Sequence, residues 1–241
     1  MNIRKIIKEE IDKVFKKRNL LVLIGPPSVG KSHWISEKFK GNNYIVINRD
    51  EIVDGLASSI GITYDDIFEF PPKNAKIGEL VPGRESLGVV ISSGEHLKKR
   101  TEFEYQNIRD LNNEVARRLE SKFKEAVNSD KDILIDMTNM SVMARRNIFM
   151  KINGRESEFN KIAVVFNFKD SDIVDVIKKL ATRRGEEIKA NGGSKTITPD
   201  IIDVIISNYE PPTREEGFDE IIDVDNSSEL KNALTKKQER F

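Results

Sequence analysis

Residues 25–32, Gly-Pro-Pro-Ser-Val-Gly-Lys-Ser, have the composition and spacing of a phosphate-binding loop. They directly follow the apolar run at residues 20–24, which is typical of a buried strand. In such a loop, glycines let successive backbone N–H groups surround the phosphates, a lysine reaches their outer oxygens, and the final hydroxyl ligates Mg²⁺. A glycine-containing turn without a ligand is the alternative, which the preceding strand disfavours. The sequence therefore predicts a binding site for ATP and Mg²⁺.

The side chains and backbone groups of this loop have separate predicted roles. Those expected to bind the nucleotide are Gly25, Ser28, Val29, Gly30, Lys31, Ser32 and His33. Lys31 is also a predicted catalytic residue, and the Ser32 hydroxyl is the predicted metal ligand. Trp34, on the helix that follows, is expected in the core rather than stacked on a base.

Two carboxylates follow predicted strands. Asp50 comes after the strand at residues 44–47, and Asp136 ends the strand at residues 133–136. Ligands of a parallel sheet bind beyond the carboxyl ends of its strands, so both side chains should face the nucleotide. A carboxylate there can accept the proton of an acceptor hydroxyl during phosphoryl transfer. The alternatives are that Asp50 caps a helix and that Asp136 only ends its strand.

Pairs of arginines are candidates for binding phosphate. Arg183 and Arg184, near a helix end before a glycine-containing loop, are candidates for an arginine that covers the transferring phosphate. A solvated helix terminus is their alternative. Arg145 and Arg146 could bind a phosphate on the acceptor, or lie on an exposed helix face. The run at residues 98–100, Lys-Lys-Arg, fits a solvated face better than a substrate contact.

Composition favours one α/β domain with a buried core, from 241 residues of which 38% are hydrophobic. The sequence contains neither a membrane-spanning apolar stretch nor an apolar signal region, so we expect a cytoplasmic protein. It has no cysteine and two histidines, which excludes thiolate metal sites and leaves little for a histidine-based one. The net charge is zero, so any nucleic-acid contact must be local.

Strands and helices alternate along the chain, which predicts a P-loop NTPase-type parallel β-sheet sandwiched by helices. Helices are predicted at residues 31–39, from about 50, 102–127, 142–151, 171–189 and from 199, and strands at 20–24, 44–47, 133–136, 161–168 and 218–224.

We interpret residues 1–241 as a single P-loop kinase domain with three peripheral segments. Residues 1–19 have the periodicity of an amphipathic helix, and residues 226–241 are a C-terminal tail that could dock as a helix or fray. Residues 55–100 lack periodicity and read as an insertion. This insertion could cover the acceptor channel, with residues 64–68 among its candidates, or it could stiffen the domain or form an interface.

The chain resembles the kinase module of the polynucleotide kinase/phosphatase family. The resemblance is carried in order by GPPSVGKS, NRD, DMTN, RRG and YEPPTREEGFDEI, and it covers residues 20–54 and 101–225. It implies an ATP-dependent, Mg²⁺-dependent transfer of the γ-phosphate to the 5'-hydroxyl of DNA or RNA ends, which would be the partner of this protein.

The resemblance also implies individual roles. Asp50 would be the general base, Asp136 would lie at the catalytic centre, and Arg183 or Arg184 would be the lid arginine. The residues on the substrate side would be Arg49, Thr138, Asn139, Arg145 and Arg146.

The chain departs from this family in acceptor recognition and length. Val53 stands where the phage enzyme has an arginine that grips the acceptor phosphate. Residues 210–218 match a segment that we expect to be structural. We expect no phosphatase half in these residues, since the acidic motif at residues 223–225 has only a short charged tail behind it.

Other functions fit the same motifs. One is a P-loop kinase with another hydroxyl acceptor, such as a modified base in DNA, a nucleoside or a small molecule. A nucleotide sensor and a toxin-like kinase are further alternatives. A non-catalytic nucleic-acid-binding module is the alternative from a different class, and the presence of Lys31, Ser32 and Asp50 disfavours it.

Overall fold

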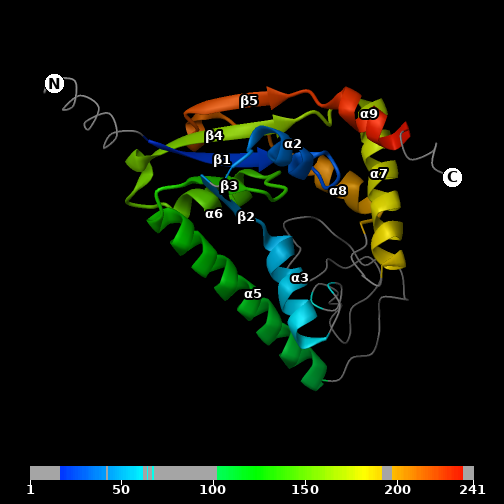
Figure 1. Ribbon diagram of the computed structural model, residues 1–241, viewed down its shortest axis with the longest axis horizontal. Helices are drawn as coiled ribbons and strands as arrows, with labels where there is room; N and C mark the ends of the chain where they lie inside the picture. Colours follow the sequence, from blue (N-terminus) through cyan, green and yellow to red (C-terminus); the bar gives the residue numbers. More distant parts are fainter. Residues whose placement is uncertain are drawn as a thin grey trace, which may run out of the picture.

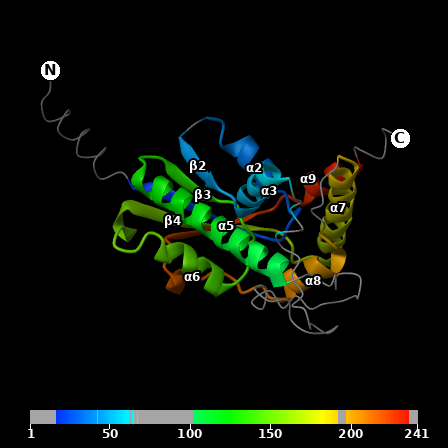
Figure 2. The same ribbon diagram turned by 90° about the horizontal axis from the view of Figure 1, so that it is seen from below.

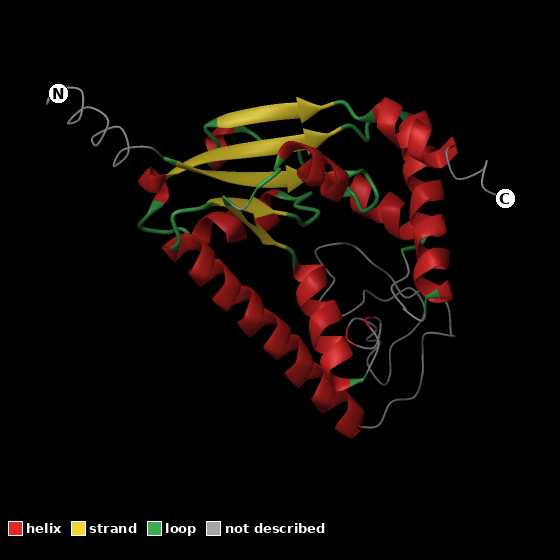
Figure 3. Cartoon of the chain, viewed as in Figure 1, coloured by secondary structure: helices red, strands yellow, loops and turns green. Residues whose placement is uncertain are grey.

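The computed structural model describes residues 17–41, 43–61, 64, 67, 102–191 and 197–235. Its centre is a five-stranded sheet in the order β2-β3-β1-β4-β5, and every neighbouring pair is parallel. The strand arrows accordingly point toward one end of the molecule (Figure 3). This architecture confirms the predicted P-loop type of parallel sheet flanked by helices.

The strands are β1 (Arg18–Ile24), β2 (Tyr44–Ile47), β3 (Asp132–Ile135), β4 (Phe159–Phe166) and β5 (Glu220–Val224). The helices are α2 (Lys31–Lys38), α3 (Arg49–Ile60), α5 (Glu102–Asn128), α6 (Val142–Met150), α7 (Ser171–Ala190), α8 (Pro199–Ser207) and α9 (Ser227–Thr235), with short 3₁₀ turns at Glu156–Glu158 and Arg214–Glu216.

Helices cover both faces of the sheet, with α2 on one side and α6 on the other (Figures 1 and 2). The central strand β1 is buried from Leu20 onward, as expected for a strand covered on both faces. It pairs with β3 from Leu20 and with β4 along its whole length. The loop that follows β1 therefore leaves the middle of the sheet at its carboxyl end.

A second, smaller apolar cluster joins α3 to α5. Its buried members are Val53, Leu56, Ala57, Ile67 and Val115. The spacing of the first three follows one face of α3, which packs on α5 below the sheet (Figure 1). This packing fixes the start of α3 beside the carboxyl end of β2.

Two segment boundaries differ from the sequence prediction. Helix α3 continues through Gly55 to Ile60, into the predicted insertion, because its buried face packs on α5. Strand β1 begins at Arg18, within the segment predicted as an N-terminal helix. Residues 1–16, the rest of that predicted helix, and most of the predicted insertion lie outside the described residues.

The C-terminal tail docks through α9, where Leu230 is buried. Helix α9 packs on α7 at the carboxyl end of the sheet (Figure 1). Among the helices of the described residues, none has the length and apolar character that a membrane crossing requires.

Candidate nucleotide and phosphoryl-transfer site

The loop between β1 and α2 has a backbone shape that requires glycine at two positions. Gly30 has φ +91°, and a Cβ atom there would lie 2.7 Å from Asn226 Nδ2. A Cβ atom on Gly25 would lie 2.8 Å from Val29 Cγ1. Ser28 also has a positive φ, of 64°. The loop is therefore closely packed, and larger residues at Gly25 or Gly30 would distort it.

The start of α2 has the features of an anion-binding helix terminus. No side chain caps it, because its N-cap residue is Gly30 in a left-handed conformation. Backbone N–H groups in the first turn of a helix have no intrahelical acceptor, and the helix dipole favours negative charge there. The first turn of α2 therefore suits a nucleotide phosphate.

Lys31 lies at this terminus with 9% of its surface exposed. Its Nζ donates hydrogen bonds to the carbonyl oxygens of Gly25 and Pro26, each at 2.9 Å. The ammonium group is therefore held over the loop, and it lines the cavity described below. A phosphate in that cavity would bring acceptors of opposite charge to a largely buried cation.

Ser32, at the start of α2, and Asp136, directly after β3, are in hydrogen-bond contact. Ser32 Oγ donates to Asp136 Oδ2 at 3.2 Å, and Asn48 Nδ2 donates to the same oxygen at 3.4 Å. A hydroxyl and a carboxylate oxygen are ligands that Mg²⁺ accepts, with nucleotide phosphates and water completing its shell. The described residues contain no group of three or more His, Asp or Glu side chains suited to a metal. The donor set therefore fits a nucleotide-borne Mg²⁺ rather than a site made by protein alone.

Asp50 lies in the first turn of α3 and is half-buried. Asn48, not Asp50, caps this helix, because its side chain accepts from the backbone N–H of Asp50 at 2.9 Å. The carboxylate of Asp50 accepts a hydrogen bond at 2.6 Å from the hydroxyl of Tyr64. Burial, then the nearby Asp50 charge, raises the pKa of Tyr64 well above its ordinary value. The phenol therefore remains a donor at every physiological pH.

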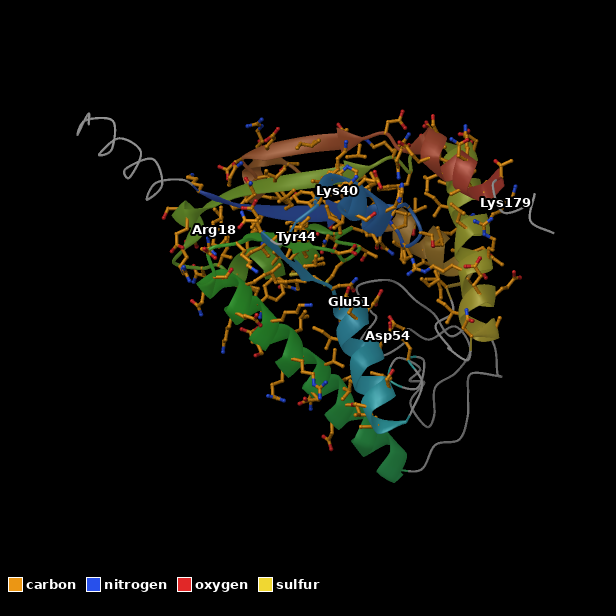
Figure 4. The ribbon with its side chains drawn as sticks, in the orientation of Figure 1. Arg18, Lys40, Tyr44, Glu51, Asp54 and Lys179 are labelled. Atoms are coloured by element: carbon orange, nitrogen blue, oxygen red, sulfur yellow. The ribbon has the colours of Figure 1, made fainter. Side chains whose placement is uncertain are left out.

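These groups line one cavity of about 1460 Å³ at the carboxyl end of the sheet. Predicted site residues that line it are Ser28, Gly30, Lys31, Ser32, His33, Asp50, Asp136, Thr138, Arg183 and Arg184. Helices α2, α3, α7 and α9 contribute to its walls. In Figure 4, Glu51 and Asp54, which also line the cavity, mark the α3 wall.

The two candidate lid arginines differ in their contacts. Arg183 Nη2 donates to the carbonyl oxygen of Ala233 at 2.8 Å, and Nη1 donates to that of Leu234 at 3.2 Å. Arg183 therefore ties α7 to the last turn of α9. Arg184 is exposed on the cavity wall, and no hydrogen bond or ion pair within the described chain engages it.

Arg145 does not have either of its predicted roles. It is fully buried, and its guanidinium forms a two-point ion pair with Glu216, with both N–O distances 2.8 Å. It also donates to the Asn139 carbonyl oxygen at 3.1 Å. The prediction of a phosphate contact is wrong, because these partners use the guanidinium hydrogen-bond donors and Arg145 does not line the cavity. The segment predicted to be structural supplies Glu216, which confirms that part of the prediction.

Three other predicted substrate contacts do not line the cavity. Asn139 is buried, and its Nδ2 donates to the Leu23 carbonyl oxygen at 2.8 Å, so it joins the loop after β3 to β1. Arg146 is exposed on α6, which covers the other face of the sheet from α2. Arg49 is half-buried at the start of α3. These three residues have defined positions in the fold, but none of them lines the cavity.

Gly25 and Val29 are buried within the loop rather than in the cavity wall. Trp34 packs on Phe39 and Phe166, with ring centroids 5.5 and 5.9 Å away, which confirms the expected core contact. Trp34 is also among the residues that line the cavity.

Two cavity residues make contacts that the sequence did not predict. Asn226, after β5, is buried, and its Nδ2 donates to the Val29 carbonyl oxygen at 2.5 Å. Tyr64 was expected only as part of a substrate cover, whereas it contacts the predicted base directly. No local pattern marks either contact, because each partner comes from a different part of the chain.

A search of curated protein sequences gives no match. Among solved structures, a candidate kinase from Chloroflexus aurantiacus J-10-fl is 11% identical, with a TM-score of 0.46, and the match covers 93% of this chain and 96% of that one.

The PezAT toxin-antitoxin system of Streptococcus pneumoniae gives 13% identity and a TM-score of 0.45 over 90% of this chain and 74% of the other. A gluconokinase from Sinorhizobium meliloti 1021 gives 12% identity and a TM-score of 0.35 over 93% and 94%.

A family model described as AAA domain, AAA_33, matches residues 20–193, which include the phosphate-binding loop, both candidate aspartates and the arginine pair. The chain therefore belongs to the AAA_33 family of AAA domains, and it has a P-loop-type α/β fold with a parallel five-stranded sheet.

Proposed function

We propose that this protein is an ATP-dependent polynucleotide 5'-hydroxyl kinase. The observation that supports phosphoryl transfer best is that Lys31, at the phosphate-binding loop, and Asp50, on α3, line the same cavity. A kinase needs a place for the γ-phosphate next to a group that can accept the acceptor's proton. The polynucleotide acceptor rests on the family resemblance of the motifs.

In the proposed reaction the acceptor hydroxyl lies between Asp50 and the γ-phosphate. Its proton passes to a carboxylate oxygen of Asp50, and its oxygen forms a bond to the γ-phosphorus. The bond from the γ-phosphorus to the β–γ bridging oxygen breaks, and ADP leaves. Asp50 then returns the proton to water.

The other cavity residues position and neutralise the phosphates. Lys31 and the first-turn N–H groups of α2 would bind them, and Arg184 would cover the transferring group from α7. Mg²⁺ would be held by Ser32 Oγ and Asp136, and when bound it neutralises charge that develops on the phosphates.

A second acceptor class is favoured by the charge of the α3 wall. Asp50, Glu51 and Asp54 all line the cavity there, and Figure 4 shows Asp54 on the side of α3 toward α7. A polyanionic strand prefers a basic groove. This wall therefore favours a small or uncharged hydroxyl compound.

Labelled-phosphate transfer from ATP tests both proposals. The acceptors are 5'-hydroxyl DNA and RNA oligonucleotides, the same oligonucleotides with 5'-phosphate ends, DNA with hydroxymethylated bases, and nucleosides. The first proposal requires transfer only to strands with a free 5'-hydroxyl, and transfer that persists on 5'-phosphorylated strands or favours nucleosides contradicts it. Asp50→Asn and Lys31→Ala provide the background rates.

A further inference from the structure

The hydroxyl of Tyr64 contacts the side chain on which the proposed chemistry depends. It donates to Asp50 Oδ1 at 2.6 Å, which is short for a hydrogen bond between two oxygens. Both side chains line the cavity, and both are half-buried. A donor at this distance restricts the carboxylate to a limited range of orientations.

The surroundings of Tyr64 are anchored by packing and by a hydrogen bond. Ile67 is fully buried in the cluster of α3 and α5, next to Val53 and Val115, and Tyr64 packs against that cluster. Asn112 Nδ2, on α5, donates to the Ile67 carbonyl oxygen at 3.1 Å. The phenol is therefore held on the same rigid pair of helices that carries Asp50.

Burial, and after it the negative charges around this contact, raise the pKa of Tyr64 and keep the proton on the tyrosine. Asp50 and Asp54 are the negative groups that act on Tyr64, Arg49 is the positive one, and all three belong to α3. The residues of α5 in the same cluster, Leu111 and Val115, are apolar. A neutral phenol that donates to a carboxylate stabilises its ionised form.

We propose that Tyr64 is a positioning residue for Asp50, holding the carboxylate ionised and oriented for proton acceptance from the acceptor hydroxyl. The proposal rests on the proposed function for its catalytic consequence. It links Tyr64, which follows α3 in the chain, to the chemistry through this hydrogen bond. Tyr64 takes no proton and forms no covalent bond in the reaction.

The expected consequence of losing this hydrogen bond has a definite sign. Without the donor, the ionised form of Asp50 is less favoured, so its carboxyl group binds a proton at higher pH. The acidic limb of the pH–rate profile should therefore move upward by about one pH unit, since a hydrogen bond to a charged group accounts for about that much. At neutral pH, kcat should fall about 10-fold from lost orientation, with KM for ATP unchanged.

Tyr64→Phe removes only the hydroxyl and keeps the ring in the cluster. Tyr209→Phe is the matched control, because Tyr209 is also half-buried and packs on Phe168 outside the cavity lining. We expect the lower kcat and the shifted acidic limb only in Tyr64→Phe. Equal kcat and an unmoved limb in Tyr64→Phe would overturn the proposal.

A second measurement separates this proposal from the proposed function. Carbon-13 NMR follows the titration of the Asp50 carboxyl group, assigned with Asp50→Asn, in the folded wild type and in Tyr64→Phe. A higher titration midpoint in Tyr64→Phe supports the positioning contact even if no acceptor is phosphorylated, in which case only the proposed function fails. An unchanged midpoint and carboxyl shift overturn the positioning role, whatever the kinase assay gives.

Discussion

The cavity has a donor side, where residues 25–32 would bind ATP, and an acceptor side, where Asp50 would face the hydroxyl compound. The two sides are built in different ways. On the donor side, residues 25–32 obtain their shape from backbone constraints, since Gly30 has a positive φ and both glycines would clash if they carried a Cβ atom. On the acceptor side, Asp50 is oriented by side chains, with Asn48 capping its helix and Tyr64 donating to its carboxylate. One side is therefore shaped mainly by its own backbone, with Asn226 packed against it, and the other by side-chain hydrogen bonds.

This difference has a functional meaning. Nucleotide phosphates are the same in all reactions of this type, so a loop of backbone donors suffices to bind them. The acceptor varies, and side chains on α3 and beyond it can change without disturbing the loop. Changes on the two sides should therefore separate the binding of ATP from the transfer of its phosphate.

Asp50→Asn should give the largest separation between ATP binding and phosphate transfer. The amide keeps the size of the side chain but cannot accept the acceptor's proton, so we expect kcat to fall by about 10³–10⁴. ATP affinity should remain within about twofold, because the donor side is unchanged. Rapid-quench transfer assays and calorimetric titration with ATP measure the two quantities.

Asp175→Asn, an exposed change on α7 outside the cavity lining, is the control for Asp50→Asn and should match the wild type. If Asp50→Asn turned over at the wild-type rate, Asp50 would not be the base, and the acceptor side would have to lie elsewhere.

Much of the donor side could be predicted from sequence because its determinants are adjacent in the chain. The strand, loop and helix at residues 20–38 are encoded by an apolar run, two glycines and a lysine-serine pair. Arg145 was misinterpreted because its partner, Glu216, lies 71 residues away. Arg183 bonds to a carbonyl 50 residues away, and Tyr64 lies within residues 55–100, which have no periodicity. Such pairs are fixed by tertiary packing, which one sequence does not display.

Arg145→Met should show that this arginine belongs to neither side of the cavity. Because the change leaves the Glu216 carboxylate without its partner, we expect the free energy of unfolding to fall by about 3–5 kcal/mol. Urea denaturation measures this loss. KM for the acceptor should not change in the protein that remains folded.

Arg146→Ala provides the control, since an exposed side chain on the same helix should alter stability by less than about 0.5 kcal/mol. A raised acceptor KM in Arg145→Met at wild-type stability would restore the phosphate-binding role.

The two arginines of α7, Arg183 and Arg184, should also differ in whether their loss lowers kcat or stability. Arg184→Ala removes the exposed guanidinium from the cavity wall, so we expect kcat to fall on the order of 100-fold with little change in melting temperature. Arg183→Ala removes the hydrogen bonds to α9 and should lower stability by about 1 kcal/mol, with a smaller loss of kcat. Transfer kinetics and thermal unfolding of both variants decide the assignment. The reverse pattern would make Arg183 the lid arginine.

We expect the smallest effect from Gly30→Ala, which tests whether the backbone conformation of the phosphate-binding loop requires glycine. Gly30→Ala places a Cβ atom 2.7 Å from Asn226 Nδ2 in a backbone conformation that costs alanine about 1–2 kcal/mol. If the loop relaxes to relieve that strain, its N–H groups move away from the phosphates. Since about 1.4 kcal/mol corresponds to a tenfold change in affinity, we expect ATP to bind about 10-fold more weakly, measured by calorimetric titration.

Gly55→Ala is the matched control for Gly30→Ala. Gly55 lies within α3, and beyond the nearby backbone of its own helix no atom of the described residues comes within 4 Å of the position of an added Cβ. Alanine there should raise stability by about 0.5–1 kcal/mol and leave ATP affinity unchanged. If Gly30→Ala instead bound ATP as tightly as Gly55→Ala, the loop would tolerate a side chain at its most restricted residue. The donor side would then depend on side chains as the acceptor side does, and the contrast between them would not hold.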